Sequence, residues 1–238
     1  MEITSVNNPL VKETVKLHQK KYRDDRQVFI VEGYHLFEEA SNAGIIRQVF
    51  TTDRRIIAKN VVYVTETVLN KISQMKSSQS VVAVCNKFES KEITDKVLIL
   101  EKIQDPGNLG ALLRSALAFG FDTVILDNTV DLYNDKVIRS TQGAMFQLNI
   151  IHMSTLDFIN ENEQYTIYGT SFDGEEISGL LLDKKLAVVL GNEGNGVSKE
   201  VLLKTNKNIT IKTKNVESLN VAVAGSIIMH EMSMKWYW

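Results

Sequence analysis

Residues 186–196 read Leu186-Ala187-Val188-Val189-Leu190-Gly191-Asn192-Glu193-Gly194-Asn195-Gly196, a run of five apolar residues followed by a glycine-rich polar loop. A short apolar run that ends at glycine is typical of a strand buried on both faces of a parallel sheet. Polar groups that follow such a strand lie at the carboxyl edge of the sheet, where α/β proteins bind their ligands. The stretch therefore predicts an α/β fold with a binding site just after residue 190.

Short apolar runs alternate with segments of helical periodicity across the rest of residues 95–238. The expected strands there are 97–100, 123–126, 148–151, 166–169 and 209–211. The expected helices are 109–119, 135–141, a helix after residue 198, and 220 to about 235. This alternation favours a parallel sheet that helices cover on both faces.

A smaller α/β unit is expected in the N-terminal part of the chain. Its expected strands are 28–32, 49–51, 61–64 and 81–84, with helices through 37–40 and over 66–75. The charged stretch 86–92 then interrupts the apolar pattern. We therefore expect a small domain over residues 1–90 and a larger one over residues 95–238.

Composition limits the classes of function. With 238 residues, 44% of them hydrophobic, the chain can bury a sizeable core and is not disordered. Its net charge of -2 argues against binding nucleic acid with the whole surface, although a local basic patch is compatible with it. The single cysteine, Cys85, excludes an internal disulfide and a cysteine-rich metal site, which suits a reducing cytoplasm. No N-terminal signal region or membrane-spanning run is visible, so we expect a cytoplasmic protein.

A basic stretch runs from Lys12 to Arg26. Within it, Lys12, Lys16, Lys20 and Lys21 fall at helical spacing and are expected to share one helix face. Such a face suits contact with phosphate groups, and it equally suits plain exposure to solvent.

Two further polar clusters match the glycine-rich loop. Asp105-Pro106-Gly107-Asn108-Leu109-Gly110 precedes the helical run that carries Arg114, and Glu217-Ser218-Leu219-Asn220 precedes an apolar helix of small residues. Backbone N–H groups stand free at such helix starts. Arg114 suits gripping a phosphate or a developing oxyanion, because a guanidinium stays protonated.

Each cluster also has a structural interpretation. The glycine-rich loop differs from the dinucleotide fingerprint and could be a strand-to-helix turn with Ser198 as N-cap. Asn108 could be an N-cap, and Arg114 could pair with a surface carboxylate. The presence of all three clusters in one chain favours a catalytic or binding role over these structural interpretations.

Taken together, the clusters resemble the three motifs of the SpoU-type (TrmH family) branch of the SPOUT RNA methyltransferases, from about Val97 to the C-terminus. The N-terminal part, with Asn8-Pro9, Lys20-Lys21 and residues 29–33, resembles the substrate-binding domain of that family, which is similar to a small ribosomal-protein fold. The resemblance implies transfer of a methyl group from S-adenosyl-L-methionine (AdoMet) to a ribose 2′-hydroxyl of rRNA or tRNA. It also implies a deep trefoil knot in the larger domain, a homodimer and no metal.

The matching positions imply site residues. Around the reacting centre the resemblance places Asn108, Arg114, Glu193, Ser218 and Asn220. For the cofactor it implies Gly169, Thr170, Leu190, Gly191, Ile211 and Leu219, acting through backbone groups and apolar surface. The RNA-binding candidates are Lys16, Lys20, Lys21 and Arg23. In homodimers of this family the site lies near the subunit interface, so Arg114 could act across it.

One departure concerns Lys212, which stands where many members of the family have proline; with Lys214 it either adds affinity for phosphate or belongs to a solvated loop.

The expected chemistry needs alignment and proton removal, because a methyl sulfonium is already a good electrophile. A guanidinium is a poor base, so we expect Arg114 to stabilise the forming alkoxide. Ser218, Glu193 or a water molecule would take the proton. The four histidines do not cluster in the sequence and are interpreted as structural or surface groups.

Three rival interpretations stay open. A non-catalytic RNA-binding protein would not need the whole polar set. A nucleotide-dependent oxidoreductase or a Rossmann-type methyltransferase would place its glycine motif after the first strand. An RNA base methyltransferase on the same fold differs only in the atom it modifies, which product analysis decides.

Overall fold

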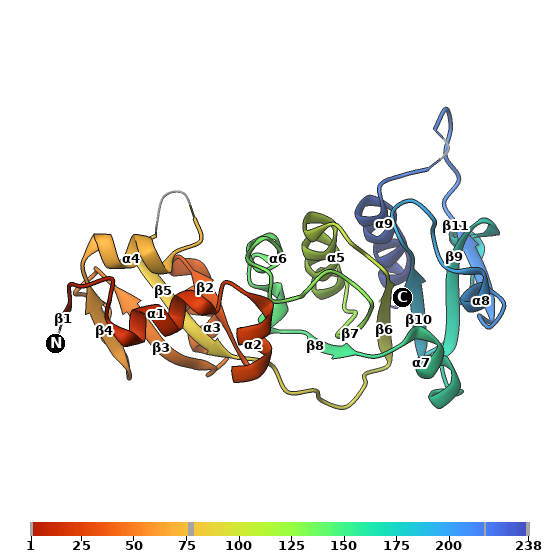
Figure 1. Ribbon diagram of the computed structural model, residues 1–238. Coiled ribbons are helices and arrows are strands. Elements are labelled where there is room, and N and C mark those ends of the chain that lie inside the picture. The colour runs from red at the N-terminus through yellow and green to blue at the C-terminus, as the bar shows by residue number, and fades with distance from the viewer. Residues whose placement is uncertain (1, 76–78, 217, 237–238) are drawn as a thin grey trace. The chain divides into compact units, whose positions relative to one another are not determined.

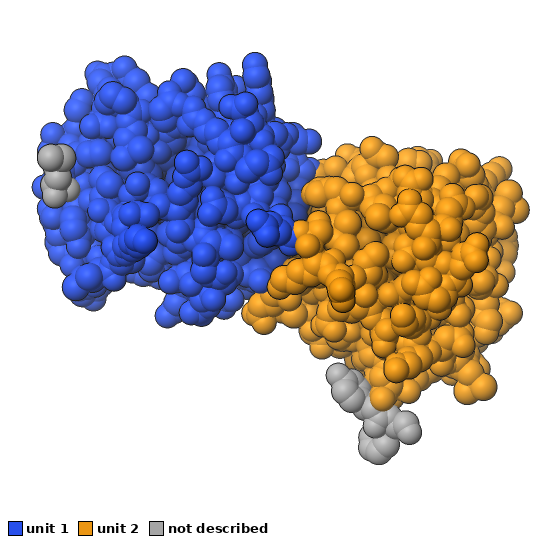
Figure 2. Space-filling model, turned by 90° about the horizontal axis from the view of Figure 1, so that it is seen from below, with its two compact units in different colours: residues 1–89, 131–146 blue, residues 90–130, 147–238 orange. Residues whose placement is uncertain are grey.

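The computed structural model describes residues 2–75, 79–216 and 218–236. The chain forms two compact units, one of residues 1–89 with 131–146 and one of residues 90–130 with 147–238 (Figure 2). Residues 131–146 thus belong to the first unit, although the larger expected domain contains them. In the described part of the chain, no helix is long and apolar enough to cross a membrane.

The first unit is built on a five-stranded mixed sheet in the order β1-β4-β3-β5-β2 (Figure 1). Strand β5 is antiparallel to its neighbours β2 and β3, whereas β4 is parallel to β3 and β1. The strands are β1 (Glu2–Ile3), β2 (Val28–Glu32), β3 (Ile46–Thr51), β4 (Val61–Val64) and β5 (Val81–Asn86). The helices are α1 (Pro9–Lys16), α2 (Lys20–Arg26), α3 (Tyr34–Asn42), α4 (Glu66–Ile72), α6 (Asp135–Thr141) and the 3-10 turn η1 (Ala144–Phe146).

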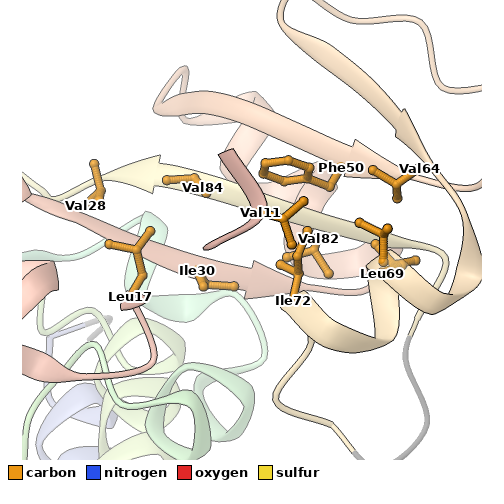
Figure 3. Packing of buried hydrophobic residues seen from close by; sticks show 11 residues of the cluster. Val11, Leu17, Val28, Ile30, Phe50, Val64, Leu69, Ile72, Val82 and Val84 are labelled. Atoms are coloured by element: carbon orange, nitrogen blue, oxygen red, sulfur yellow. The ribbon is translucent and has the colours of Figure 1, made fainter. Parts of the chain in front are cut away.

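Alternation along the strands divides the core of this unit between the two faces of its sheet. Val28 and Ile30 of β2 pack with Val11 of α1 and Leu69 of α4 in one apolar cluster (Figure 3). Phe29, between them in the sequence, contacts Tyr133 with ring centroids 4.7 Å apart, and it also lies against Phe88 and Phe146. This aromatic contact explains why residues 131–146 join the first unit, since it buries rings that would otherwise face water.

The basic stretch forms two helices. Helix α1 ends at Lys16, and Gln19, whose backbone is extended (φ -96°, ψ 132°), is the N-cap from which α2 starts at Lys20. Lys12 and Lys16 therefore lie on α1, and Lys20 and Lys21 lie on α2. The expectation of one continuous helical face is wrong, because helical spacing in the sequence does not reveal a break between two short helices.

Arg23 lies inside this unit. Its side chain pairs with the Asp131 carboxylate, and its Nη1 donates to the carbonyl oxygens of Leu17 and His18 at 2.9 Å. The residue is only 6% exposed. We therefore remove Arg23 from the RNA-binding candidates, because a buried, paired guanidinium cannot meet a phosphate without breaking these bonds.

The second unit is built on a six-stranded sheet in the order β11-β9-β10-β6-β7-β8 (Figure 1). All of its strand pairs are parallel, which confirms the predicted sheet. The strands are β6 (Lys96–Glu101), β7 (Thr123–Asp127), β8 (Asn149–His152), β9 (Thr166–Glu176), β10 (Leu186–Leu190) and β11 (Lys207–Thr210). The helices are α5 (Pro106–Ala118), α7 (Thr155–Glu161), α8 (Lys199–Leu202), α9 (Val221–Met234) and the 3-10 turn η2 (Ile177–Gly179).

Helices cover both faces of this sheet, as predicted. Val97 and Ile99 of β6 pack with Phe158 of α7 and Val201 of α8. The opposite face is covered by α5 and α9, which meet where Gly225 of α9 lies against the side chains of Leu112 and Leu190. Both faces of β6 and β10 are therefore shielded from water, which explains their near-continuous apolar sequences.

Candidate active site

Loops from two adjacent strands meet at the carboxyl edge of the second sheet. Leu190 at the end of β10 pairs with Leu100 of β6, so the loops that follow the two strands begin side by side at the same edge of the sheet. The Glu193 carboxylate reaches from one loop to the other and accepts hydrogen bonds from the backbone N–H groups of Gln104, at 3.2 Å, and Asp105, at 3.0 Å. Glu193 thus ties the glycine-rich loop to the start of α5.

The same carboxylate begins a chain of side-chain hydrogen bonds. Asn108 Nδ2 donates to Glu193 Oε1 at 3.2 Å, and Asn220 Nδ2 donates to Asn108 Oδ1 at 3.0 Å. Asn220 Oδ1 in turn accepts from the backbone N–H groups of Ala222 and Val223 and so caps α9. We call this arrangement the Glu193–Asn108–Asn220 chain. It joins three of the five predicted reacting-centre residues, from three separate parts of the sequence.

Asn108 is not the N-cap of α5. The cap is Asp105, whose Oδ1 accepts from the Asn108 backbone N–H at 2.8 Å, and Pro106 occupies the first helical turn, where a missing N–H costs nothing. The side chain of Asn108 is therefore left to link Glu193 and Asn220. The alternative interpretation of Asn108 as a helix N-cap is therefore wrong.

The glycine-rich loop is held closed by residues that the sequence analysis did not single out. Asn192 Nδ2 donates to the Lys102 carbonyl at 3.0 Å, and Asn192 pairs through its backbone with Gly196. Glu101, only 3% exposed, accepts from the Ser198 backbone N–H at 2.9 Å. The sequence did contain a signal for Glu101. A carboxylate at the end of an otherwise apolar strand is expected to be buried, and a buried charge needs a dedicated hydrogen-bond partner.

The Glu193 carboxyl is kept ionised. Partial burial alone would raise its pKa, but hydrogen bonds from Asp105, from its own backbone, from Asn108 and from Gln104 outweigh burial and hold the pKa below the ordinary value. A carboxylate with several donors and a lowered pKa is a poor proton acceptor near neutral pH. We infer that Glu193 positions the loops.

The lowered pKa predicts a pH-dependent effect of Glu193→Gln on stability. Because the folded-state pKa lies below the unfolded value of about 4.3, the carboxylate stabilises the fold above that value and loses this effect as pH falls through the folded pKa. The variant should lose about 1 kcal/mol at neutral pH, since hydrogen bonds to a mostly exposed group contribute modestly. Urea unfolding of both proteins from pH 7 to pH 3 measures the difference, which should shrink toward the acid end. A difference that stays constant over this range would contradict an ionised Glu193.

Arg114 and Ser218 lie outside the Glu193–Asn108–Asn220 chain. Both are exposed. Six residues along a helix correspond to a net turn of about 240°, so Arg114 and Asn108 project from different sides of α5. Within the described ranges, the Arg114 guanidinium makes no hydrogen bond or ion pair. The structural alternative, in which Arg114 pairs with a surface carboxylate, therefore finds no support.

The predicted cofactor residues lie on several elements of the second unit. Gly169 and Thr170 lie within β9, where its ladder with β10 ends, Ile211 follows β11, and Leu219 comes just before α9. Leu190 and Gly191 are buried, and Ile211, Leu219 and Thr170 are half-buried. Thr170 Oγ1 donates to the Val189 carbonyl at 3.0 Å and ties β9 to β10. Apolar side chains beside glycine backbone fit an adenosine group, because its ring is apolar and its edges can bond to backbone N–H and C=O groups.

Two details alter the expected shape of this edge. Asn208 of β11 pairs with Gly169, but the next residue pairs with Glu175, so residues 170–174 leave the ladder and return to it. Lys212 pairs with Glu176 at 2.9 Å. The Lys212 ammonium is therefore engaged within the protein.

The remaining basic candidates lie on the first unit. Lys16 donates to Glu13 at 2.6 Å. Lys20 and Lys21 are exposed at the start of α2. Neither lysine forms a hydrogen bond or ion pair in the part of the chain that the structure describes, so both ammonium groups face solvent.

Comparison with known proteins gives concordant results. A model of the SpoU rRNA Methylase family matches residues 95–230, and a model of the MRM3-like substrate binding domain matches residues 8–83. The chain is 34% identical to the Bacillus subtilis 23S rRNA (guanosine(2553)-2′-O)-methyltransferase RlmP, over 97% of this chain and 98% of that protein.

Two solved structures are similar over the whole chain. One is an AdoMet-bound rRNA methyltransferase from Sinorhizobium meliloti, with a TM-score of 0.89 and 27% identity, covering 100% of this chain and 98% of the other. The second is an RNA 2′-O ribose methyltransferase with a TM-score of 0.83, 27% identity and full coverage of both chains.

Proposed function

This chain belongs to the SpoU rRNA methylase family, and from that premise we propose that it transfers the methyl group of AdoMet to a ribose 2′-hydroxyl of ribosomal RNA. The observation that carries the proposal is the Glu193–Asn108–Asn220 chain, which assembles three motif residues at one sheet edge. RNA binding alone would not require this arrangement.

AdoMet supplies, when bound, a methyl group on a positively charged sulfur. The predicted apolar residues and glycines, which lie within β9, at the end of β10, after β11 and before α9, would hold it, with Thr170 tying β9 to β10. The protein must then exclude water and align the ribose hydroxyl. Asn108 and Asn220 fix the relative positions of α5 and α9 at this edge.

The Arg114 guanidinium stabilises the alkoxide that forms at the 2′-oxygen. Glu193 is an unsuitable proton acceptor because hydrogen bonds lower its pKa. The proton of the hydroxyl therefore passes to solvent water, either directly or through the Ser218 hydroxyl, which gains one proton and releases its own. Of the three expected proton acceptors, the carboxylate is the one that the hydrogen bonds around it disfavour.

We also propose a homodimer that buries the outer face of α9. Val223, Ile227 and Met234 are 49%, 36% and 47% exposed, and their spacing of four and seven residues places them on one side of the helix. An exposed apolar stripe of this kind suits an interface between copies. Arg114 would reach the reacting centre of the other subunit, which agrees with its position away from the Asn108 side of α5.

The finer assignments belong to the same proposal. The similarity to the Bacillus subtilis enzyme favours 23S rRNA as the RNA and a cytoplasmic location, since ribosomes are assembled there. A trefoil knot in the second unit and a methyltransferase domain that begins near residue 95 are further parts of it.

Mass spectrometry of nucleosides tests the proposal. Ribosomal RNA from a strain lacking this gene, its parent and a complemented strain are digested and compared. Loss and recovery of one 2′-O-methyl nucleoside is the expected result. Loss of a base-methylated nucleoside would instead show a base methyltransferase, and unchanged methylation would favour an RNA-binding protein without catalysis.

Lys20 and Lys21 are expected to contact phosphate groups of the RNA. The double variant Lys20→Glu/Lys21→Glu should weaken RNA binding several-fold and reduce the slope of log K against log salt by about one to two, because each phosphate contact releases counterions. Filter binding to a 23S rRNA transcript at several KCl concentrations measures the slope. Lys71→Glu/Lys136→Glu is the matched control, since it changes the charge equally on α4 and α6. Equal slopes for both double variants would show that Lys20 and Lys21 make no phosphate contact with the RNA.

A further inference from the structure

A groove of about 780 Å³ lies in the first unit between α1 and the neighbouring strands. Its floor includes Leu17, Val28 and Val84, which are 3%, 2% and 6% exposed and belong to the apolar cluster of Figure 3. Leu10 of α1 also lines the groove and is 38% exposed. The volume falls in the range of about 300–1,000 Å³ that is usual for small-molecule sites. The apolar surface open to a ligand is therefore mainly that of Leu10, with the buried side chains closing the bottom of the groove.

The charged groups at this groove sum to a positive charge. Glu13 accepts from both Lys16 and Arg26, which hold its pKa below the ordinary value, so the carboxylate is ionised and doubly paired. Arg47 of β3 is exposed, and its guanidinium has no hydrogen-bond or ion-pair partner among residues 2–75, 79–216 and 218–236. The groove is thus lined by one carboxylate, Glu13, and two guanidinium groups, of which Arg47 is uncommitted. An anionic ligand fits this charge.

Two amide side chains at the groove, those of Gln48 and Asn60, have hydrogen-bond acceptors that no residue described by the structure uses. Gln48 Nε2 donates to the Asn60 carbonyl, and Asn60 Nδ2 donates to the Arg47 carbonyl at 3.1 Å. These bonds engage the two NH₂ groups with backbone carbonyl oxygens. The side-chain carbonyl oxygens of Gln48 and Asn60 accept from no residue that the structure describes. They are available to N–H groups of a ligand.

We propose that this groove binds an unpaired nucleotide of the RNA substrate, with the base against Leu10 and the apolar floor and a phosphate at Arg47. The proposal rests on the proposed function, and it names a second contact besides Lys20 and Lys21. Gln48 and Asn60 accept hydrogen bonds from the base. Sequence-specific RNA recognition mostly uses unstacked bases on apolar or planar surfaces, with phosphate contacts for position.

A double helix fits the groove less well than a single nucleotide. Paired bases present sugars and phosphates outward, and these gain nothing from an apolar floor. An apolar peptide would leave Arg47 without a partner. The combination of apolar floor, unpaired cation and amide acceptors matches a nucleotide in all three respects.

The test uses the full chain and an unmodified 23S rRNA transcript. Arg47→Glu should raise KM for the transcript about tenfold with kcat within about twofold, because one charge-assisted phosphate contact is lost away from the chemistry. Lys71→Glu is the matched control, since it makes the same change of charge on α4, outside the groove. Thermal unfolding of both variants confirms that each is folded. A shift in KM that is the same for the two variants would overturn the proposal.

A second measurement does not depend on turnover. Photocrosslinking with a 4-thiouridine transcript, followed by peptide mass spectrometry, should yield nucleotide-bearing peptides from α1 and from β3 around Arg47. If the wild-type protein does not methylate the transcript, the proposed substrate fails, but these crosslinks still support the groove. Crosslinks confined to other parts of the first unit would overturn it. An Arg47→Glu protein that binds RNA normally but loses a co-purifying protein would make the groove a protein-binding surface.

Discussion

Arg114→Ala is expected to lower kcat for methyl transfer at least about a hundredfold. The reason is that the substitution removes a group that stabilises charge in the transition state. The Kd for AdoMet should stay near the wild-type value, because Arg114 lies on α5 and none of the predicted cofactor residues belongs to that helix. The fold should be unaffected, since the guanidinium is exposed and makes no hydrogen bond or ion pair with the described residues.

Single-turnover methylation of the 23S rRNA transcript and calorimetric titration with AdoMet measure the two quantities. Arg139→Ala is the matched control. It removes a helical arginine that pairs with Asp135 at 2.7 Å, four residues earlier, and with no other carboxylate that the structure describes. The methylation rate and the Kd for AdoMet should therefore both stay within about twofold of wild type. Undiminished turnover by Arg114→Ala would remove Arg114 from the reacting centre.

Mixing variants decides in which subunit Arg114 acts. Arg114→Ala and Asn220→Ala are each expected to be inactive as homodimers. If Arg114 serves the partner's site, random mixing should restore about a quarter of the wild-type rate, because half of the dimers are mixed and one of their two sites is intact. No recovery in dimers shown to exchange would place both residues in one subunit's site, and a monomeric wild-type protein would contradict the dimer itself.

Gly191→Ala is expected to have the second large effect. A Cβ atom at this position would lie 2.1 Å from the backbone C of Gly196 and 2.1 Å from the backbone N of Val197. Real Cβ atoms do not approach backbone so closely, so the loop would have to open. Overpacking of this kind costs about 3 kcal/mol. If the opened loop must close to bind AdoMet, the same energy corresponds to about a hundredfold weaker affinity.

Denaturant unfolding and AdoMet titration of Gly191→Ala check both parts of this prediction. Gly179→Ala is the matched control, because a Cβ atom there would have nothing within 4 Å. Wild-type stability and AdoMet affinity in Gly191→Ala would show that the loop adapts without cost. A loss of stability with unchanged affinity would separate the closed loop from the cofactor site.

Strands β6, β7 and β10 of the second unit were predictable because both of their faces are buried. Leu186–Leu190 was predicted with its observed bounds, and residues 97–100 and 123–126 were each found within one residue at either end. Continuous apolar runs report this burial directly. Helix α7 and strand β1 were missed, since α7 has only seven residues and β1 only two. Segments this short carry too few residues for a periodicity to appear.

Side chains whose partners lie far away in the sequence were harder to interpret. Arg23 counted as a surface cation until its pairing with Asp131, 108 residues later, placed it inside the first unit. Glu193 was one of three candidate proton acceptors, beside Ser218 and water. The structure shows donors from Gln104, Asp105 and Asn108 around its carboxylate, which disfavour that role. In both cases the chemistry of the group depends on its partners, and the residue type alone does not reveal them.

The sequence by itself determined the α/β class of the larger unit, the positions of its buried strands and the three polar motifs that follow or precede them. These features are local, because burial of a strand and capping of a helix are encoded within a few residues. Only the tertiary structure decided that Glu193, Asn108 and Asn220 form one hydrogen-bonded chain, that Arg114 stands apart from it, and that residues 131–146 pack with the first unit. These outcomes depend on distances between segments far apart in the sequence, which packing of the whole core sets.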